Sequence, residues 1–197
     1  RAQAQAHAAA TALAQHRQQL REAQRLAKVG SWELDLQSNV LTWSDELFQI
    51  FELDPAETTT SYELFLSYVH PEDRALLERS YRESVANRSS YDIEHRVLMP
   101  DGRVKYLREC GETFYRDDGT PLRSIGTAQD VTSRRQMEAK MQLLGSAFQH
   151  SGEAILISDH DNNIVTVNPA FSQLTGYSAE NGGLRYSHVT DASGQAY

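Results

Sequence analysis

The feature that most constrains the fold is a set of three extended segments, separated by tight turns, between residues 91 and 131. Within residues 91–99 every second side chain is apolar, aromatic or His, which is the period of a strand with one buried face. Asp-Gly dipeptides at 101–102 and 118–119 favour hairpin turns. We therefore predict an antiparallel meander of three strands, over residues 91–99, 103–115 and 121–131.

Two further strands and a helical stretch precede this meander. Residues 31–36 and 40–43 flank a Gln-Ser-Asn turn and are expected to form a hairpin. Short helical patches over 45–69 are followed by a longer helix that should begin at Pro71 and end near Asn87. The side chains expected to face the core from this helix are Leu76, Leu77, Tyr81 and Val85. The order predicts an α+β fold, with a five-stranded antiparallel sheet and helices on one face.

Helical segments flank the predicted sheet. Residues 2–27 contain no Gly or Pro, which favours a continuous helix. Ser133 and Gln136 have the spacing of a capping box, which predicts the start of another helix that ends near residue 150. Apolar residues recur every seven positions in the first of these helices and at steps of four, three and four in the second. Both patterns predict coiled-coil seams that would hold a parallel homodimer. The seam residues are Leu13, Leu20, Met137, Met141, Leu144 and Phe148. A solvated Ala-rich helix is the alternative for the first segment.

The chain also repeats itself. A shift of 124 residues aligns Asp35 with Asp159 and Thr42 with Thr166 without a gap, so a second copy begins near residue 153. Because the chain starts with Arg1 rather than Met, we interpret it as a piece of a longer protein. The expected organisation is a connector helix over 1–28, a complete domain over 29–132, a linker helix over 133–150, the beginning of a second domain over 151–180, and a disordered or non-native tail over 181–197.

Five motifs follow one another along the first domain: GSWELD at 30–35, LTWSDEL at 41–47, HPEDR at 70–74, EHRVLMPDG at 94–102 and GTAQDVT at 126–132. In this order they resemble the successive signatures of the PAS-3 subgroup of PAS domains. The segments AILISD at 154–159 and NPAFSQLTGY at 168–177 resemble the beginning of another PAS domain. The resemblance implies the PAS fold, in which a five-stranded antiparallel sheet and its helices enclose a ligand-sized core.

The resemblance also implies a signalling role for the end of the last strand. Asp130, Val131 and Thr132 match the family's closing Asp-Ile-Thr motif, which joins this strand to the outgoing helix. Short acceptor side chains at such a junction can bind the free N–H groups of the first helical turn, so a small strand shift would rotate or loosen the helix. The alternative is a plain helix cap without a role in signalling.

The implied pocket would be bounded by inward side chains, which are Trp32, Trp43, Phe48, Tyr91, Ile93, His95 and Val97. The sequence leaves its occupant open, and an empty pocket is one alternative. Haem is not supported. Haem-binding relatives usually place the ligand His on the long helix, which here carries only His70, at its end. A lone His on a strand, such as His95, is more often a hydrogen-bonded core residue than a haem ligand. Light-sensing flavin chemistry is not supported, because Cys110 lies outside a Gly-x-Asn-Cys motif and Ala128 stands where such relatives have Gln.

The sequence shows no catalytic motif. It contains no phosphate-binding Gly-rich loop, no His-Glu-x-x-His and no Cys and His at metal-ligand spacing, and Glu94 with Arg96 is interpreted as a structural cross-strand pair. A formal charge of −8 at pH 7 disfavours nucleic-acid binding, and no apolar run is long enough for a membrane span. A single cysteine fits a reducing compartment. We expect a non-catalytic cytoplasmic segment, whose parent could be attached to a membrane upstream.

Together these patterns favour a sensory module. It would perceive a small ligand, a cofactor state or a dimer contact, and relay the signal through the linker helix to an output domain of the same polypeptide. The segment QLLGSAF at 142–148 resembles linkers of bacterial multi-PAS proteins that make or degrade cyclic-di-GMP, so such a cyclase or phosphodiesterase is the favoured output domain. The alternatives are a histidine kinase parent and a ligand-free PAS domain that acts only as a dimerisation spacer.

Overall fold

The computed structural model describes residues 2–177, with the backbone alone for residues 2–10, 13 and 17. The chain divides into two compact units, Arg1–Arg135 and Gln136–Tyr197. The tail predicted over 181–197 lies outside the described residues, as does the end of the predicted second domain. Within residues 2–177, no helix combines the length and the apolar composition needed to cross a bilayer.

The first unit is built on one antiparallel sheet in the order β2-β1-β5-β4-β3. Its strands are β1 (Val29–Asp35), β2 (Val40–Trp43), β3 (Tyr91–Leu98), β4 (Val104–Tyr115) and β5 (Pro121–Asp130). The predicted hairpin is β1–β2 and the predicted meander is β3–β4–β5. The pairing of β1 with β5 joins these two pieces, so the five-stranded α+β fold is confirmed.

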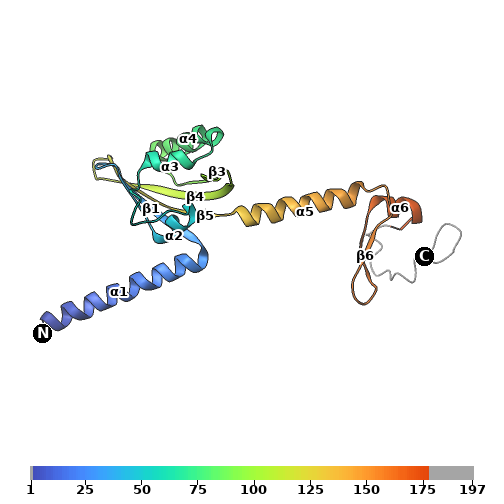
Figure 1. Ribbon diagram of the computed structural model, residues 1–197, viewed down its shortest axis with the longest axis horizontal. Coiled ribbons are helices and arrows are strands. Elements are labelled where there is room, and N and C mark those ends of the chain that lie inside the picture. Colours follow the sequence, from blue (N-terminus) through green and yellow to red (C-terminus); the bar gives the residue numbers. More distant parts are fainter. Residues whose placement is uncertain (1, 178–197) are drawn as a thin grey trace. The chain divides into compact units, whose positions relative to one another are not determined.

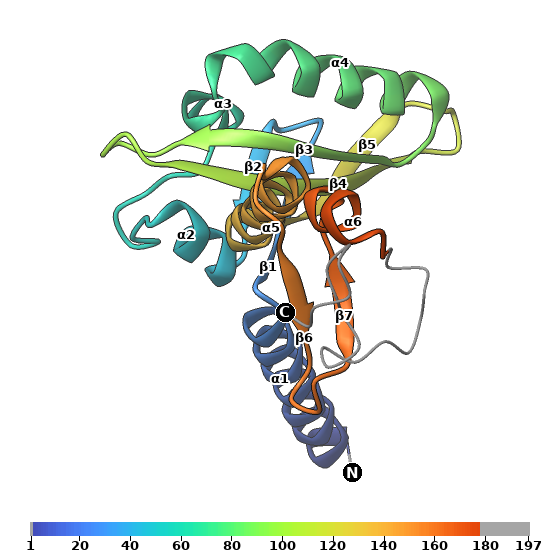
Figure 2. The same ribbon diagram turned by 90° about the vertical axis from the view of Figure 1, so that its right-hand side faces the viewer.

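Helices α2 (Asp45–Phe51), α3 (Tyr62–Tyr68) and α4 (Pro71–Asn87) lie between β2 and β3 in the chain, and α1 (Ala2–Ala27) precedes the sheet. Figures 1 and 2 show α3 and α4 on the same side of the sheet. Leu77 is buried, whereas Leu76 is 39% exposed, so the predicted inward position of Leu76 is wrong. Adjacent helical residues are separated by about 100° around the axis, so only one of the two can face the sheet.

One row of residues crosses all five strands and forms the floor of the core. From β2 to β3 the row consists of Trp43, Trp32, Gly126, Gly111 and Tyr91. Paired residues share a face of the sheet, so the two glycines leave room for the neighbouring rings. A Cβ on Gly126 would lie 2.5 Å from Trp32 Cζ2, and one on Gly111 would lie 2.8 Å from Tyr91 Cε1.

The second unit contains most of α5 (Thr132–His150), followed by β6 (Leu156–Ser158), β7 (Ile164–Val167) and α6 (Pro169–Thr175). The repeat seen in the sequence recurs in its hydrogen bonds. In the first unit, Ser31 N donates to Ser44 Oγ at 2.9 Å and Ser44 N donates to Ser31 O at 2.9 Å. In the second unit, Ile155 N donates to Asn168 Oδ1 at 2.9 Å and Asn168 N donates to Ile155 O at 3.0 Å.

The side chain of Asn168 is fully buried and joins three segments of the second unit. Its Nδ2 donates to Phe148 O near the end of α5 and to Glu153 O, while its Oδ1 also accepts from Phe171 N in α6. The equivalent Ser44 of the first unit has a shorter side chain and makes no cap bond to α2. The longer Asn side chain therefore fastens the end of the linker helix to the hairpin that follows it.

Candidate functional site

A small cavity of about 40 Å³ lies between the sheet and the helices of the first unit. The residues that line it are Trp32, Leu34, Leu41, Trp43, Leu47, Phe51, Tyr62, Phe65, Leu77, Tyr81, Tyr91, Glu109 and Ala128. A buried water needs roughly 10–15 Å³, so the cavity has room for about three waters or a ligand of a few heavy atoms. Pockets for drug-sized ligands are about ten times larger.

Three of the seven predicted pocket residues line this cavity: Trp32, Trp43 and Tyr91. The other four do not. Phe48 is partly buried beside it and contacts the edge of Trp43, with ring centroids 5.6 Å apart. His95 and Val97 continue the inward face of β3 beyond the cavity, where Val69 bridges to Val97 and closes the core. Ile93 is half-buried between these positions and Tyr91.

Glu109 is the distinctive polar residue of the cavity, and the sequence reasoning did not identify it. Its side chain lies on the inward face of β4, two residues from the fully buried Leu107, and the residue is 5% exposed. The Tyr91 hydroxyl donates to Glu109 Oε1 at 2.8 Å, but Oε2 has no hydrogen-bond partner. Burial raises the pKa of Glu109 to about 7, against the opposing effect of the Tyr91 bond. The sequence signal that could have identified Glu109 is an acidic residue on the buried face of a predicted strand.

His95 lies close to Glu109 without pairing with it. The Nε2 atom of His95 is 3.8 Å from Glu109 Oε2, which is too long for a hydrogen bond, and both ring nitrogens lack partners. Burial lowers the pKa of His95 to about 4, so the imidazole is neutral at neutral pH. The two side chains therefore do not form an ion pair there.

The predicted relay residues form the junction between β5 and α5. Asp130 Oδ1 accepts from Thr132 N at 2.9 Å, and this turn starts α5 at Thr132. The capping-box start predicted at Ser133 is therefore wrong by one residue. Val131 N donates to Tyr106 O at 2.9 Å, and Thr132 Oγ1 accepts from Tyr106 N at 2.9 Å. Both bonds attach the start of α5 to β4.

A second attachment joins the start of α5 to β3. Glu94 accepts from Arg134 at 2.5 Å and from Arg135 Nε at 2.7 Å. The predicted pair between Glu94 and Arg96 is therefore wrong, because the first turn of α5 supplies closer guanidinium groups. Arg96 instead donates to Asp73 at the start of α4, with Nε 2.9 Å from Oδ2, and this guanidinium lowers the pKa of Asp73 to about 2.

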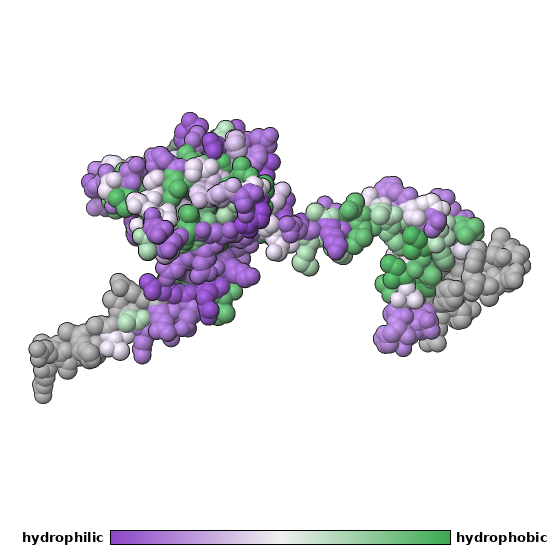
Figure 3. All heavy atoms as spheres, viewed as in Figure 1, coloured by the Kyte–Doolittle hydropathy of each residue, from purple (hydrophilic) through white to green (hydrophobic). Residues whose placement is uncertain are grey.

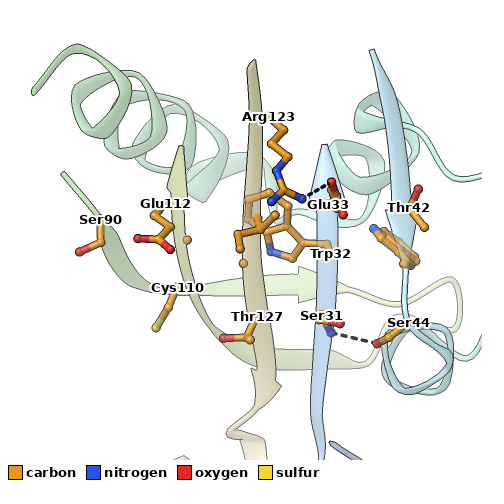
Figure 4. Close-up of a pocket in the computed structure, with 14 residues that line it drawn as sticks. Ser31, Trp32, Glu33, Thr42, Ser44, Ser90, Cys110, Glu112, Arg123 and Thr127 are labelled. Atoms are coloured by element: carbon orange, nitrogen blue, oxygen red, sulfur yellow. Dashed lines mark hydrogen bonds and ion pairs between the residues drawn. The ribbon is translucent and has the colours of Figure 1, made fainter. Parts of the chain in front are cut away.

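An open groove of about 680 Å³ lies on the outer face of the sheet, opposite the core (Figure 4). Figure 4 shows Arg123 on β5 reaching toward Glu33 on β1, and the two side chains are joined by a 2.9 Å hydrogen bond. Cys110 also lines this groove, and partial burial raises its pKa. A raised pKa disfavours the thiolate, so the groove contains no activated nucleophile at this position.

The predicted seam of the linker helix is exposed in the single chain. Met137, Met141 and Leu144 are 69%, 68% and 55% exposed, while Phe148 is partly buried. Figure 3 shows the resulting apolar patches along α5. On α1, Leu20 is 61% exposed, and the side chain of Leu13 lies outside the described residues.

A five-stranded antiparallel sheet with helices inserted after its second strand and a cavity beneath them defines a PAS sensory domain. Residues 40–128 match the family described as PAS fold, and residues 142–194 match the family described as PAS domain. These matches together cover more than half of the chain. The chain belongs to the PAS family.

Curated relatives are signalling proteins. The chain is 27% identical over 171 residues to the probable diguanylate cyclase DgcE of Escherichia coli. The aligned region covers 83% of this chain and 15% of that protein. It is 27% identical over 157 residues to the sensor protein FixL of Bradyrhizobium diazoefficiens. This alignment covers 76% of this chain and 30% of that protein. The chain thus spans less than a third of either relative.

A solved structure supports the fold. The sensory box histidine kinase/response regulator of Burkholderia thailandensis superposes with a TM-score of 0.57 at 22% identity, over 67% of this chain and 98% of that one. Since the sequence identity is low, this similarity concerns the fold.

Proposed function

We propose that the first unit perceives a small ligand in its core cavity and passes the resulting strand movement to α5. The observation that carries this proposal is the attachment of the first turn of α5 to β3 and β4 through Glu94 and Tyr106. The same two strands carry Tyr91 and Glu109 at the cavity. A change at the cavity therefore acts on the strands to which the outgoing helix is bound.

The relay residues are the proposed point of transfer. Glu109 lies three residues along β4 from Tyr106, and a strand displacement at the cavity would change the hydrogen-bond geometry between Tyr106 and Thr132. Because Thr132 is the first residue of α5, this change would loosen or rotate the helix. Two arrangements of the junction, with different affinities for the ligand, are sufficient for signalling.

Tyr91→Phe is expected to change amide exchange in the first turn of α5. The substitution removes the hydroxyl bond to Glu109 and keeps the ring, so it perturbs the cavity with little change in packing. Hydrogen exchange of the amides of residues 132–136, followed by NMR, should change about threefold or more. Tyr115→Phe is the matched control, because Tyr115 donates to Val85 O away from the cavity. An equal change in both variants, or none in Tyr91→Phe, would contradict the relay.

A parallel homodimer through α5 is part of the proposed function. Leu144→Glu should raise the dimer dissociation constant about 100-fold, because the seam would bury an unpaired charge. Leu143 is also exposed on α5, at 69%, but lies off the seam, so Leu143→Glu introduces the same charge as a control. Sedimentation velocity over a range of concentrations measures both. A dimer equally weakened by both substitutions, or a monomer without any substitution, would rule out this seam.

The proposed output domain makes or degrades cyclic-di-GMP. Similarity to a diguanylate cyclase over most of this chain supports the assignment. Similarity to a sensor protein and to blue-light-activated histidine kinases supports a kinase parent as the alternative. The proposal assigns no catalysis to the chain and places it in the cytoplasm, in keeping with its single cysteine. A dimerisation spacer would show neither ligand binding nor the Tyr91→Phe response.

A further inference from the structure

The wall of the core cavity is dominated by aromatic rings. Seven of its residues are aromatic: Trp32, Trp43, Phe51, Tyr62, Phe65, Tyr81 and Tyr91. The rings also contact one another, since Trp43 stacks on Phe51 with centroids 4.7 Å apart, and Tyr81 meets Tyr91 edge-on at 6.1 Å. Aromatic faces carry partial negative charge and attract ammonium groups, most strongly where water is excluded.

Glu109 adds a buried carboxylate to this wall, and the described residues that line the cavity include no Lys, Arg or His to balance it. His95 is the nearest basic side chain, but it is neutral near pH 7 and 3.8 Å away. Burial keeps Tyr62 and Tyr91 protonated, since it raises the pKa of Tyr62 to about 12 and that of Tyr91 further. An ionised carboxylate in this position is costly unless a counter-charge joins it.

These observations identify a class of ligand for the cavity, an inference that rests on its proposed sensory role. We propose that the cavity binds a compact ammonium cation of about the size of methylammonium, which donates to Glu109 Oε2 and lies against the aromatic rings. The free Oε2 atom provides the acceptor, the rings provide faces for the cation, and the 40 Å³ volume limits the ligand to a few heavy atoms.

A neutral hydroxyl compound is the discriminating comparison. Methanol has the same number of heavy atoms as methylammonium and can also donate a hydrogen bond to Oε2. It does not balance the charge of the carboxylate and gains no cation–π attraction. The site therefore favours the cation once Glu109 is ionised, and the preference should grow as the pH rises.

The test titrates the full chain with methylammonium chloride or methanol at constant ionic strength. Both tryptophans of the chain line the cavity, so their indole N–H signals in two-dimensional NMR spectra report on it. We expect saturable shifts with methylammonium, and affinity that rises about tenfold from pH 6 to pH 8 as Glu109 ionises. Glu109→Gln should weaken binding at least tenfold at pH 8, whereas Glu112→Gln, on the other face of β4, should leave it unchanged.

Each other outcome overturns the inference. Equal saturable binding of methanol, or full methylammonium binding by Glu109→Gln, would show a sensory cavity that does not select cations, and the proposed relay would stand. Absence of binding by both compounds would remove the cation site. The relay is then judged separately by the exchange response of Tyr91→Phe, which needs no added ligand.

Discussion

Glu109→Gln is expected to become more stable relative to the unsubstituted chain as the pH rises from 5 to 8, by roughly 2–3 kcal/mol. The folded state holds the proton of Glu109 up to a pKa of about 7, compared with an ordinary value of 4.5. Stability from this residue is therefore fully present below pH 4.5 and is lost as the pH rises through 7. Gln has no proton to lose, so the variant lacks this loss.

The other titratable groups that face Glu109 do not reverse this sign. Tyr91 and Tyr62 remain protonated throughout the range, and Tyr81 of α4 contributes a third phenol. His95 acts in the opposite direction, because its lowered pKa removes stability as the pH falls from 6.5 through 4. That contribution is present in both proteins, so the difference between them isolates Glu109.

Urea unfolding at several pH values, followed by tryptophan fluorescence, measures this prediction, because both tryptophans belong to the first unit. Glu112→Gln changes the formal charge equally at an exposed position and should stay within about 0.5 kcal/mol of the unsubstituted chain at each pH. A constant difference between Glu109→Gln and the unsubstituted chain from pH 5 to 8 would show that Glu109 does not titrate there.

Gly126→Ala is expected to destabilise the first unit by about 3 kcal/mol or more, at the upper end for overpacked cores. The added Cβ would lie 2.5 Å and 2.6 Å from two indole carbons of Trp32, and it would also meet the carbonyl oxygen of Cys110. The indole is bounded by the core, and the carbonyl belongs to the paired strand β4. Neither can move away without disturbing the sheet.

The same substitution at Gly145 is the control. Gly145 lies in α5, and apart from the backbone of this helix and its chain neighbours no described atom lies within 4 Å of an added Cβ. Gly145→Ala should therefore leave the first unit unchanged and favour the helix by roughly 0.5–1 kcal/mol. Thermal unfolding compares the two variants. In a Trp32→Leu background, the Gly126→Ala substitution should cost less stability than it does in the unsubstituted chain, since the clashing ring is absent there. Unfolding at the same temperature as the unsubstituted chain would refute the packing of this row.

The framework of the first unit could be predicted because its signals are local. Alternation over residues 91–99 and the Asp-Gly turns define β3, β4 and β5, and the Pro at position 71 defines the start of α4. Local signals were less reliable at boundaries and side-chain pairs. Helix α5 begins at Thr132 because Asp130 binds its N–H, and Glu94 pairs with the helix rather than with Arg96.

The candidate site required the tertiary structure. Trp32, Trp43 and Tyr91 could be placed near a pocket from their strand positions, but the selection of Phe48, Ile93, His95 and Val97 assumed a larger cavity than the packing leaves. Glu109 was missed because one acidic residue in a strand has an ordinary solvated interpretation until both faces are known. Its importance comes from contacts with residues that lie far away in the sequence.

By itself, the sequence determined the five-stranded antiparallel sheet, the order of its elements, the internal repeat and the position of the junction with α5, because turns, periodicity and caps depend on residues close together in the chain. The assignment of this fold to the PAS family came from the resemblance of its motifs to those of that family. Only the tertiary structure decided that Gly126 and Gly111 make room for aromatic rings, and that Glu109 is buried beside them without a counter-charge. Burial and unpaired charge are properties of the packed sheet and helices, and the pKa of Glu109 follows from that packing.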